Sequence, residues 1–285
     1  MQHLDPLVFD LEKAFVELDQ LSAGLVFATR GSQAFLSTQS DFLLVCCCGF
    51  NHRADRTAEM GKVQITPLVF IIWVFAIAAQ GEPTLERIAF GSCLRVKHSN
   101  DVWPAISAKH PQAFLFMGDN IYGDTNRMDI LRKKYDALLN HPGYRGLLDS
   151  DCKILATWDD HDYGLNDLGA DHKFKEGSQK AFVEMFQVSE ERGPAQRAGI
   201  YDSYIFGPEG KRVQVILLDT RYFRSSLVRQ PATARVLGKY GENRDPNATV
   251  LGDVQWTWLE EQLRQPAEVR LLVSSIQILP VDHFW

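Results

Sequence analysis

Beyond residue 84 the chain alternates between short apolar runs and longer amphipathic stretches. The apolar runs have the length of β-strands, and they cover Arg87–Cys93, Ala113–Asp119, Cys152–Asp160, Arg212–Thr220 and Val269–Gln277. The stretches between them repeat apolar residues at helical spacing, and they cover Val102–Lys109, Met128–Leu139, Lys175–Phe186 and Val254–Leu263. Alternation of this kind predicts an α/β fold in which helices cover a largely parallel or mixed sheet.

Two local signals refine this outline. The segment Gly199–Gly207 is followed by the turn residues 208–210, "PEG", so we expect it to form a hairpin with the next strand. Asp253 stands just before the last amphipathic stretch, where we expect it to cap the helix.

Polar side chains collect where the predicted strands end. They are Ser92, Cys93, Asp119, Asp159, Asp160, Asp219, Ser274, Ser275 and Gln277. Ligands of open α/β sheets bind at the carboxyl ends of the strands. One pocket is therefore expected to gather these side chains.

The segment Ala156–Asp167, "ATWDDHDYGLND", is rich in acid and contains no Lys or Arg. Carboxylates this close raise one another's pKa unless a cation compensates, and a metal ion is the economical compensation. Among these acids, His161 is a candidate metal ligand, a candidate proton donor, or only an oriented neighbour of Asp162.

A second box, "GDNIYGD" at Gly118–Asp124, follows a predicted strand. Asp119 and Tyr122 can aim oxygen ligands at one cation, and such ligands suit ferric iron, calcium or magnesium. The same pattern is common in plain turns. Cys93, at another strand end, is either a thiolate ligand or a small buried hydrophobe, whereas Cys152 is assigned to the core.

A third box, "LLDTR", places Asp219 and Arg221 at a strand end. Arginine can hold phosphate oxygens in a bidentate fork, which makes Arg221 a candidate phosphate clamp. The alternative is a structural ion pair between Asp219 and Arg221 near the surface.

Composition narrows the class of protein. With 285 residues, of which 45% are hydrophobic, the chain can bury one large core. A net charge of -6 offers no basic face for a nucleic-acid backbone, so no nucleic-acid-binding surface is expected. The five cysteines show no disulfide-like spacing, although Cys93 and Cys152 could pair in an oxidising compartment. No pattern sets the oligomeric state.

An unusual apolar segment, Leu68–Ala79, follows Met60. It is too short to span a bilayer comfortably but suits a signal peptide; a buried core helix is the alternative. We expect residues 1–59 to be a spurious or disordered extension and residues 60–79 to be signal-like, or else the segment to act as an internal anchor. We therefore expect the protein to be secreted or to reside in the endomembrane system or at the cell surface. Membrane contact is expected only through this segment. In a secretory protein the sequon Asn247–Thr249 could be glycosylated.

Taken together, the boxes resemble the alkaline phosphatase D (PhoD-like) family of metallophosphoesterases. The resemblance runs from about Ile88 to the last residue, through "FGSC", "GDNIYGD", "WDDHDYGLND", "LLDTR", "LGDVQWTWLEEQL" and "SSIQILP". It places the domain at residues 85–285. "GDNIY" also matches the box of purple acid phosphatases whose tyrosine binds ferric iron.

The resemblance implies a four-layer α/β/β/α sandwich and hydrolysis of phosphate monoesters or diesters with iron and calcium, or another divalent pair. Cys93, Asp119 and Tyr122 resemble the iron ligands, and Asp119 would bridge to calcium. Asp160 would take a second-metal position, with Asp159 close by.

One further role comes from the resemblance: His161 resembles the histidine that assists the leaving group. Arg221 keeps the candidate role of phosphate clamp that its own box gives it. The Val-x-x-His and Gly-His-x-His boxes of the wider superfamily are absent, and the family pattern continues beyond Trp285. We therefore expect a sandwich incomplete at the C-terminus. The alternative is a protein without catalytic activity, either an inactive, calcium-binding secretory protein or a truncated gene product that keeps the metal-ligand boxes but turns nothing over.

Overall fold

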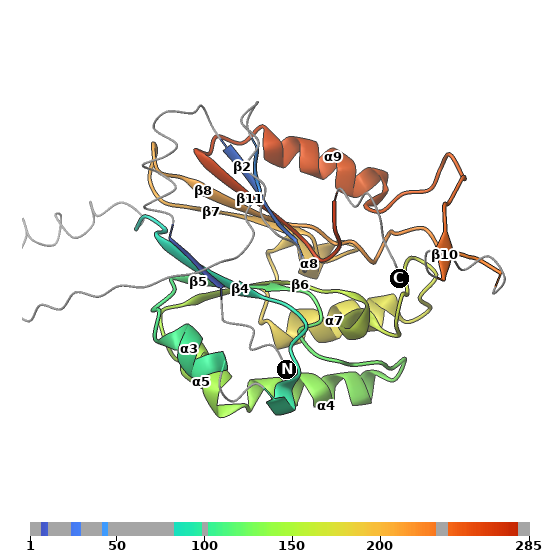
Figure 1. Ribbon diagram of the computed structural model, residues 1–285, viewed down its shortest axis with the longest axis horizontal. Coiled ribbons are helices and arrows are strands. Elements are labelled where there is room, and N and C mark those ends of the chain that lie inside the picture. The colour runs from blue at the N-terminus through green and yellow to red at the C-terminus, as the bar shows by residue number, and fades with distance from the viewer. Residues whose placement is uncertain are drawn as a thin grey trace, which may run out of the picture.

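The computed structural model describes residues 83–98, 102–231 and 239–278, together with the backbone of three short strands at 7–10, 24–29 and 42–44. The fold is mixed α/β. Two principal sheets lie one above the other in Figure 1, with helices on the outer side of each.

The lower sheet of Figure 1 carries three of the strands predicted from apolar runs. Its strands, in spatial order, are β1 (Leu7–Asp10), β4 (Arg87–Gly91), β5 (Ala113–Met117) and β6 (Lys153–Thr157). β4, β5 and β6 are parallel to one another, and β1 is antiparallel to β4. The predicted strands are confirmed, but each ends before the polar residues that close its apolar run. Those polar residues therefore lie at one edge of the sheet, in loops and, for Asp160, at the start of the short helix α6 (Asp160–Tyr163).

The upper sheet contains the other predicted strands. Its order is β3 (Phe42–Leu44), β2 (Gly24–Thr29), β11 (Val269–Ser274), β8 (Val213–Leu217) and β7 (Asp202–Phe206). β7 and β8 form the expected antiparallel hairpin, with Asp202 opposite Leu217. A separate small hairpin joins β9 (Val228–Arg229) to β10 (Tyr240–Gly241).

The N-terminal expectations concern residues that are described only in part. β1, β2 and β3 fall within residues 1–59 and pair with the two sheets. The signal-like segment 60–79 lies outside the described residues, so its role stays a prediction. In the part of the chain that the structure describes, no helix is long and apolar enough to cross a membrane.

Strand alternation separates the apolar side chains into layers. Leu115 and Met117 of β5 pack in a core that also holds Val215 and Leu217 of β8, so this core joins the two sheets. Phe116 of β5 belongs to a second core together with the helices of the lower layer. Ile216, Leu218 and Leu272 form a third core with Leu251 and Leu259, beneath the helix at the top of Figure 1.

The helices occupy the two outer faces. The lower sheet is covered by α3 (Val102–Ser107), α4 (Met128–Leu139), α5 (Pro142–Leu148) and α7 (Lys175–Met185), and the upper sheet by α9 (Gly252–Leu263). The capping role expected for Asp253 was wrong. α9 begins at Gly252 with Leu251 as its N-cap, and Asp253 lies inside the first turn, where the helix dipole favours a carboxylate.

Candidate metal centre

Three parallel strands deliver their polar loops to the same edge of the lower sheet. β4 ends at Gly91 and leads to Cys93, β5 ends at Met117 and leads to Asp119, and β6 ends at Thr157 and leads to Asp159 and Asp160. The loop after β4 is tied to the loop after β5, because Cys93 N donates to Gly118 O at 3.1 Å and Leu94 N donates to Asp119 O at 2.8 Å. The gathering of polar strand ends expected from the sequence is therefore present at these loops.

The backbone at this edge is unusual. Cys93 and Asp119 have φ values of 59° and 51°, in the left-handed region that non-glycine residues seldom occupy. Gly118 between β5 and Asp119 has φ of 102°, and a Cβ there would lie 2.7 Å from the Asp159 Cβ. Strained residues of this kind cluster at functional sites because the surrounding structure must hold them in place.

Asp119, Asp160 and His161 form a group with the geometry of a metal site. Each offers a ligand atom, and these atoms all lie within 4.8 Å of one another. Oxygens that share one calcium ion at about 2.3–2.6 Å can be as far apart as this. Both carboxylates are buried, and the imidazole is partly buried. The structure thus brings together three residues that the sequence singled out.

His161 is oriented by the neighbouring loop. Its Nδ1 lies 2.5 Å from Asp124 Oδ1, and its backbone carbonyl accepts the N–H groups of Gly123 and Asp124 at 2.8 and 3.2 Å. Nδ1 is taken by Asp124, so Nε2 is the ring nitrogen that can meet a metal or a substrate oxygen. Asp124 lies in a box noted from the sequence, but its role was not foreseen.

Tyr122 stands beside this group. Its ring centre lies 4.5 Å from that of His161, and the guanidinium carbon of Arg95 lies 4.7 Å from the Tyr122 ring centre. Lys134 of α4 holds the loop by donating to the carbonyls of Tyr122 and Gly123, each at 2.8 Å. The predicted ligand is thus placed next to His161 of the metal group, and the role of its phenol oxygen as a metal ligand stays a prediction.

Asp159 and Arg221 form a buried ion pair that connects the two sheets. Arg221, in the loop after β8, donates through Nε to Asp159 Oδ1 at 2.6 Å, and its Nη2 lies 3.7 Å from Asp160 Oδ1. Burial raises the pKa of Asp159 to about 6, even though Arg221 acts in the opposite direction. Burial would lower the pKa of Arg221, but the two aspartates outweigh it and raise that pKa. Asp159, predicted to lie at the metal, and Arg221, predicted to hold the phosphate, therefore bind each other.

Two further aspartates brace the loops from inside. Asp162 is fully buried and accepts the N–H groups of Asp159 and Asn120 at 2.7 and 3.1 Å. Burial, with Asp119 adding to it, raises the pKa of Asp162 well above its usual range. Asp219 accepts from the Trp158 indole at 2.8 Å and from three backbone N–H groups, including that of Arg221. Asp219 is thus a structural acceptor, and the alternative of a surface ion pair between its carboxylate and the Arg221 guanidinium was wrong.

The two cysteines in the described part of the chain are free thiols, so the alternative disulfide between them is not formed. Cys152 is buried, and burial raises the pKa of its thiol to about 12, which agrees with its assignment to the core. Cys93 is partly buried at the end of β4, with its Sγ 3.6 Å from Ser92 Oγ. Its role as a thiolate ligand stays a prediction.

A loop beyond the acid-rich box also reaches the site. The backbone N–H of Asp167 donates to Asp160 Oδ2 at 2.8 Å. The Asp167 carboxylate is in turn held by Tyr240 and Lys239, which belong to the small β9–β10 hairpin and its connection. No sequence pattern had pointed to Tyr240 or Lys239.

Comparison with known protein families assigns the chain to one of them. The model of the PhoD-like phosphatase family matches residues 126–283, which is more than half of the chain. The chain belongs to the PhoD-like phosphatase family. The resemblance drawn from the sequence boxes is thereby confirmed. The matched range includes Asp160, His161 and Arg221, whereas Cys93, Asp119 and Tyr122 precede it.

One solved structure, titled "Structure of PhoD", matches with 17% sequence identity and a TM-score of 0.48. The match covers 65% of this chain and 40% of that chain. This PhoD-like chain therefore spans less than half the length of the solved protein. A comparison with curated proteins gives no match.

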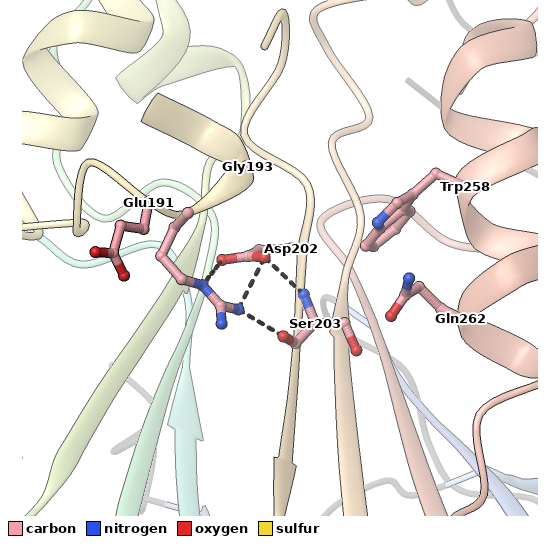
Figure 2. Close-up of a pocket in the computed structure, with 7 residues that line it drawn as sticks. Glu191, Gly193, Asp202, Ser203, Trp258 and Gln262 are labelled. Carbon is pink, nitrogen blue, oxygen red and sulfur yellow. Dashed lines mark hydrogen bonds and ion pairs between the residues drawn. The ribbon is translucent and has the colours of Figure 1, made fainter. Parts of the chain in front are cut away.

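A surface cavity shares no residue with the metal group. It has a volume of about 220 Å³ and is lined by Glu191, Arg192, Gly193, Asp202, Ser203, Trp258 and Gln262. Arg192 is already engaged, because its Nε donates to Asp202 Oδ2 at 2.9 Å and its Nη2 donates to Ser203 O at 2.5 Å. Dashed lines at Asp202 and Ser203 in Figure 2 mark these contacts. Because this cation is neutralised inside the cavity wall, the cavity offers no evident site for a phosphate group.

Proposed function

We propose that this PhoD-like protein hydrolyses phosphate esters at a metal centre built around Asp119, Asp160 and His161. The observation that supports the proposal most strongly is the convergence of their ligand atoms within 4.8 Å at the carboxyl edge of the parallel strands. The substrate class, monoester or diester, follows from the family and belongs to the proposal.

The residues present fit a metal ion. Asp119, Asp159, Asp160 and Asp162 are all buried close together, and in the described part of the chain Arg221 is the cation that pairs with this group. Burial raises the pKa of Asp159 and of Asp162, so crowding these carboxylates together has a cost that a bound cation would reduce. Asp119 and Asp160 would hold the metal, with Tyr122 and Cys93 as further ligands. Ferric iron with calcium, or another divalent pair, is the metal content we propose.

When bound, the metal supplies Lewis-acid chemistry that polarises phosphoryl oxygens and offsets negative charge. The chain contributes the proton. With Nδ1 fixed by Asp124, His161 would present Nε2 to the leaving oxygen and donate a proton there. Asp124 would stabilise the protonated ring in that orientation.

Arg221 has a different part in this proposal from the one its sequence suggests. Its guanidinium is buried and bound to Asp159, so it would fix the metal-site carboxylates and present at most one remaining edge to a phosphoryl oxygen. The Arg221–Asp159 contact would hold Asp159 in place beside Asp160. In this proposal Asp159 supports the metal site and is not one of the residues that bind the ion.

The fold assignment is extended in the same way. We propose that the two sheets and their outer helices correspond to the four-layer α/β/β/α sandwich of metallophosphoesterases. The three apolar cores, one between the sheets and one beneath each helical layer, support this correspondence.

Replacing Asp119 with Asn tests the function. The wild-type protein is expected to bind metal and to hydrolyse p-nitrophenyl phosphate or its bis-ester, and D119N is expected to lose turnover while keeping its circular dichroism spectrum. Near-normal turnover by D119N would refute the proposed centre. Metal bound by the wild type without hydrolysis of either ester would favour the alternative of a non-catalytic metal-binding protein.

Secretion through residues 60–79 is part of the proposal and has its own test. Asn247 of the sequon is exposed, so an oligosaccharide could be attached to it. Expression in a secretory host is expected to give protein that starts near Ala79 and loses mass on deglycosylation. Secreted protein that retains Met1 would contradict this view.

A further inference from the structure

We propose that the β9–β10 hairpin positions the metal-binding carboxylate of Asp160 through Asp167, which makes Tyr240 and Lys239 positioning residues for metal binding. This inference rests on the metal centre proposed above. It adds to that centre an outer set of contacts that comes from a part of the chain far away in sequence.

The first contact fixes the orientation of the Asp160 carboxylate. Asp160 Oδ2 accepts the backbone N–H of Asp167 at 2.8 Å, while Oδ1 faces Nη2 of Arg221 at 3.7 Å. The two oxygens therefore have different partners, which limits rotation of the carboxylate. Outer contacts of this kind hold metal ligands in the geometry that binds the ion.

The second contact is needed because the Asp167 backbone is strained. Its φ is 64°, in the left-handed region. A non-glycine residue is destabilised in that region and stays there only if its surroundings hold it. If Asp167 relaxed, its N–H would turn away from Asp160.

The hairpin supplies the restraint. Tyr240 donates its hydroxyl to Asp167 Oδ2 at 2.6 Å, and Lys239 Nζ lies 2.5 Å from the same oxygen. On the other side of the residue, Arg224 Nη2 donates to the Asp167 carbonyl at 2.5 Å. Tyr240 is itself anchored, because Gln230 donates to its carbonyl at 2.7 Å. The chain of contacts thus runs from the hairpin through Asp167 to Asp160.

Calorimetric titration of the metal-free protein with Mn²⁺ tests this inference, since Mn²⁺ suits carboxylate ligands. We expect Y240F and K239M each to bind Mn²⁺ about 10-fold more weakly than wild type, which is the usual effect of losing such an outer contact. R244M is the matched control. Arg244 lies in the same segment and pairs with exposed Glu242 at 3.0 Å, without contact to Asp167, so its loss should leave Mn²⁺ affinity unchanged.

Variants at Asp167 separate positioning from general stability. Asn accepts the same hydrogen bonds and tolerates the left-handed region, so D167N should stay within about 3-fold of wild type. D167A should lose about 10- to 100-fold in Mn²⁺ affinity. Y240F added to D167A should cause little further loss, because both changes break the same chain of contacts.

The outcomes are distinct. Weaker Mn²⁺ binding by Y240F and D167A, with unchanged thermal unfolding of the metal-free proteins, supports the inference. Wild-type affinity in Y240F, or a loss that merely parallels a lower melting temperature, overturns it while leaving the metal centre intact. A wild-type protein that binds no Mn²⁺ overturns the inference and the metal centre together.

Discussion

Gly118 offers a sharp test of how tightly the metal-site loops are packed. It has φ of 102°, and a Cβ there would lie 2.7 Å from the Asp159 Cβ and 2.9 Å from the Ser275 Cβ. G118A therefore brings two costs, backbone strain and a steric clash. Strain at positive φ costs about 1–2 kcal/mol, and overpacking a close contact costs about 1–3 kcal/mol. We expect G118A to lower the free energy of unfolding by about 2–5 kcal/mol.

Two other glycines separate these costs. Gly210 has φ of 83°, and a Cβ added there would meet nothing within 4 Å, so G210A should show the strain alone. Gly146 of α5 also has nothing within 4 Å and no positive φ, so G146A should stabilise the helix by about 0.5–1 kcal/mol. Urea unfolding of the three metal-free variants measures each value.

Two results of this comparison lead to opposite conclusions. If G118A is no less stable than G210A, the Asp159 and Ser275 side chains move aside freely, and the close packing of these loops does not constrain the site. If G118A is less stable and also binds Mn²⁺ more weakly, whereas G210A binds normally, the packing around Gly118 sets the metal geometry.

Three further predictions concern individual side chains. R221M should lower the free energy of unfolding by about 3–5 kcal/mol in urea at pH 7, because it leaves Asp159 buried beside Asp160 without its cation; a loss below about 1 kcal/mol would contradict the ion pair. D124N should reduce kcat for p-nitrophenyl phosphate by about 10-fold with unchanged Mn²⁺ affinity, and an unchanged kcat would remove Asp124 as the partner that orients His161. Burial lowers the pKa of His172 from its ordinary 6.5, so neutral His172 stabilises the fold above that pH and the stabilisation is lost as pH falls through the lowered value. H172Q should therefore flatten the dependence of unfolding free energy on pH in the range just below 6.5, and an identical slope in wild type would show that His172 does not titrate differently on folding.

The local pattern of the sequence predicted the strands and longer helices well. β5 and β6 follow from apolar runs that can be buried on both faces, and the polar residues after them mark the edge where the loops meet. Asp119, Asp160 and His161 could be identified because metal-ligand chemistry is concentrated in short boxes. The left-handed backbone at Asp119 could not, since it depends on contacts with the loops after β4 and β6.

Contacts between distant segments escaped the sequence analysis. Arg221 lies 62 residues from Asp159, and Tyr240 lies 73 residues from Asp167. An arginine at a strand end can bind a phosphate or a buried carboxylate equally well. Which of the two it binds depends on how the two sheets pack, and the local sequence does not show this packing. Tyr240 belongs to a two-residue strand, too short to leave a periodic signal.

The central claim is that Asp119 and Asp160 hold a metal ion beside the ring of His161. Anomalous scattering from crystals of the metal-free protein soaked in Mn²⁺ tests it most directly. We predict a manganese peak about 2.0–2.6 Å from a carboxylate oxygen of both Asp119 and Asp160, with the His161 ring beside it. A protein that shows no peak there, or a peak only elsewhere on its surface, would contradict the account.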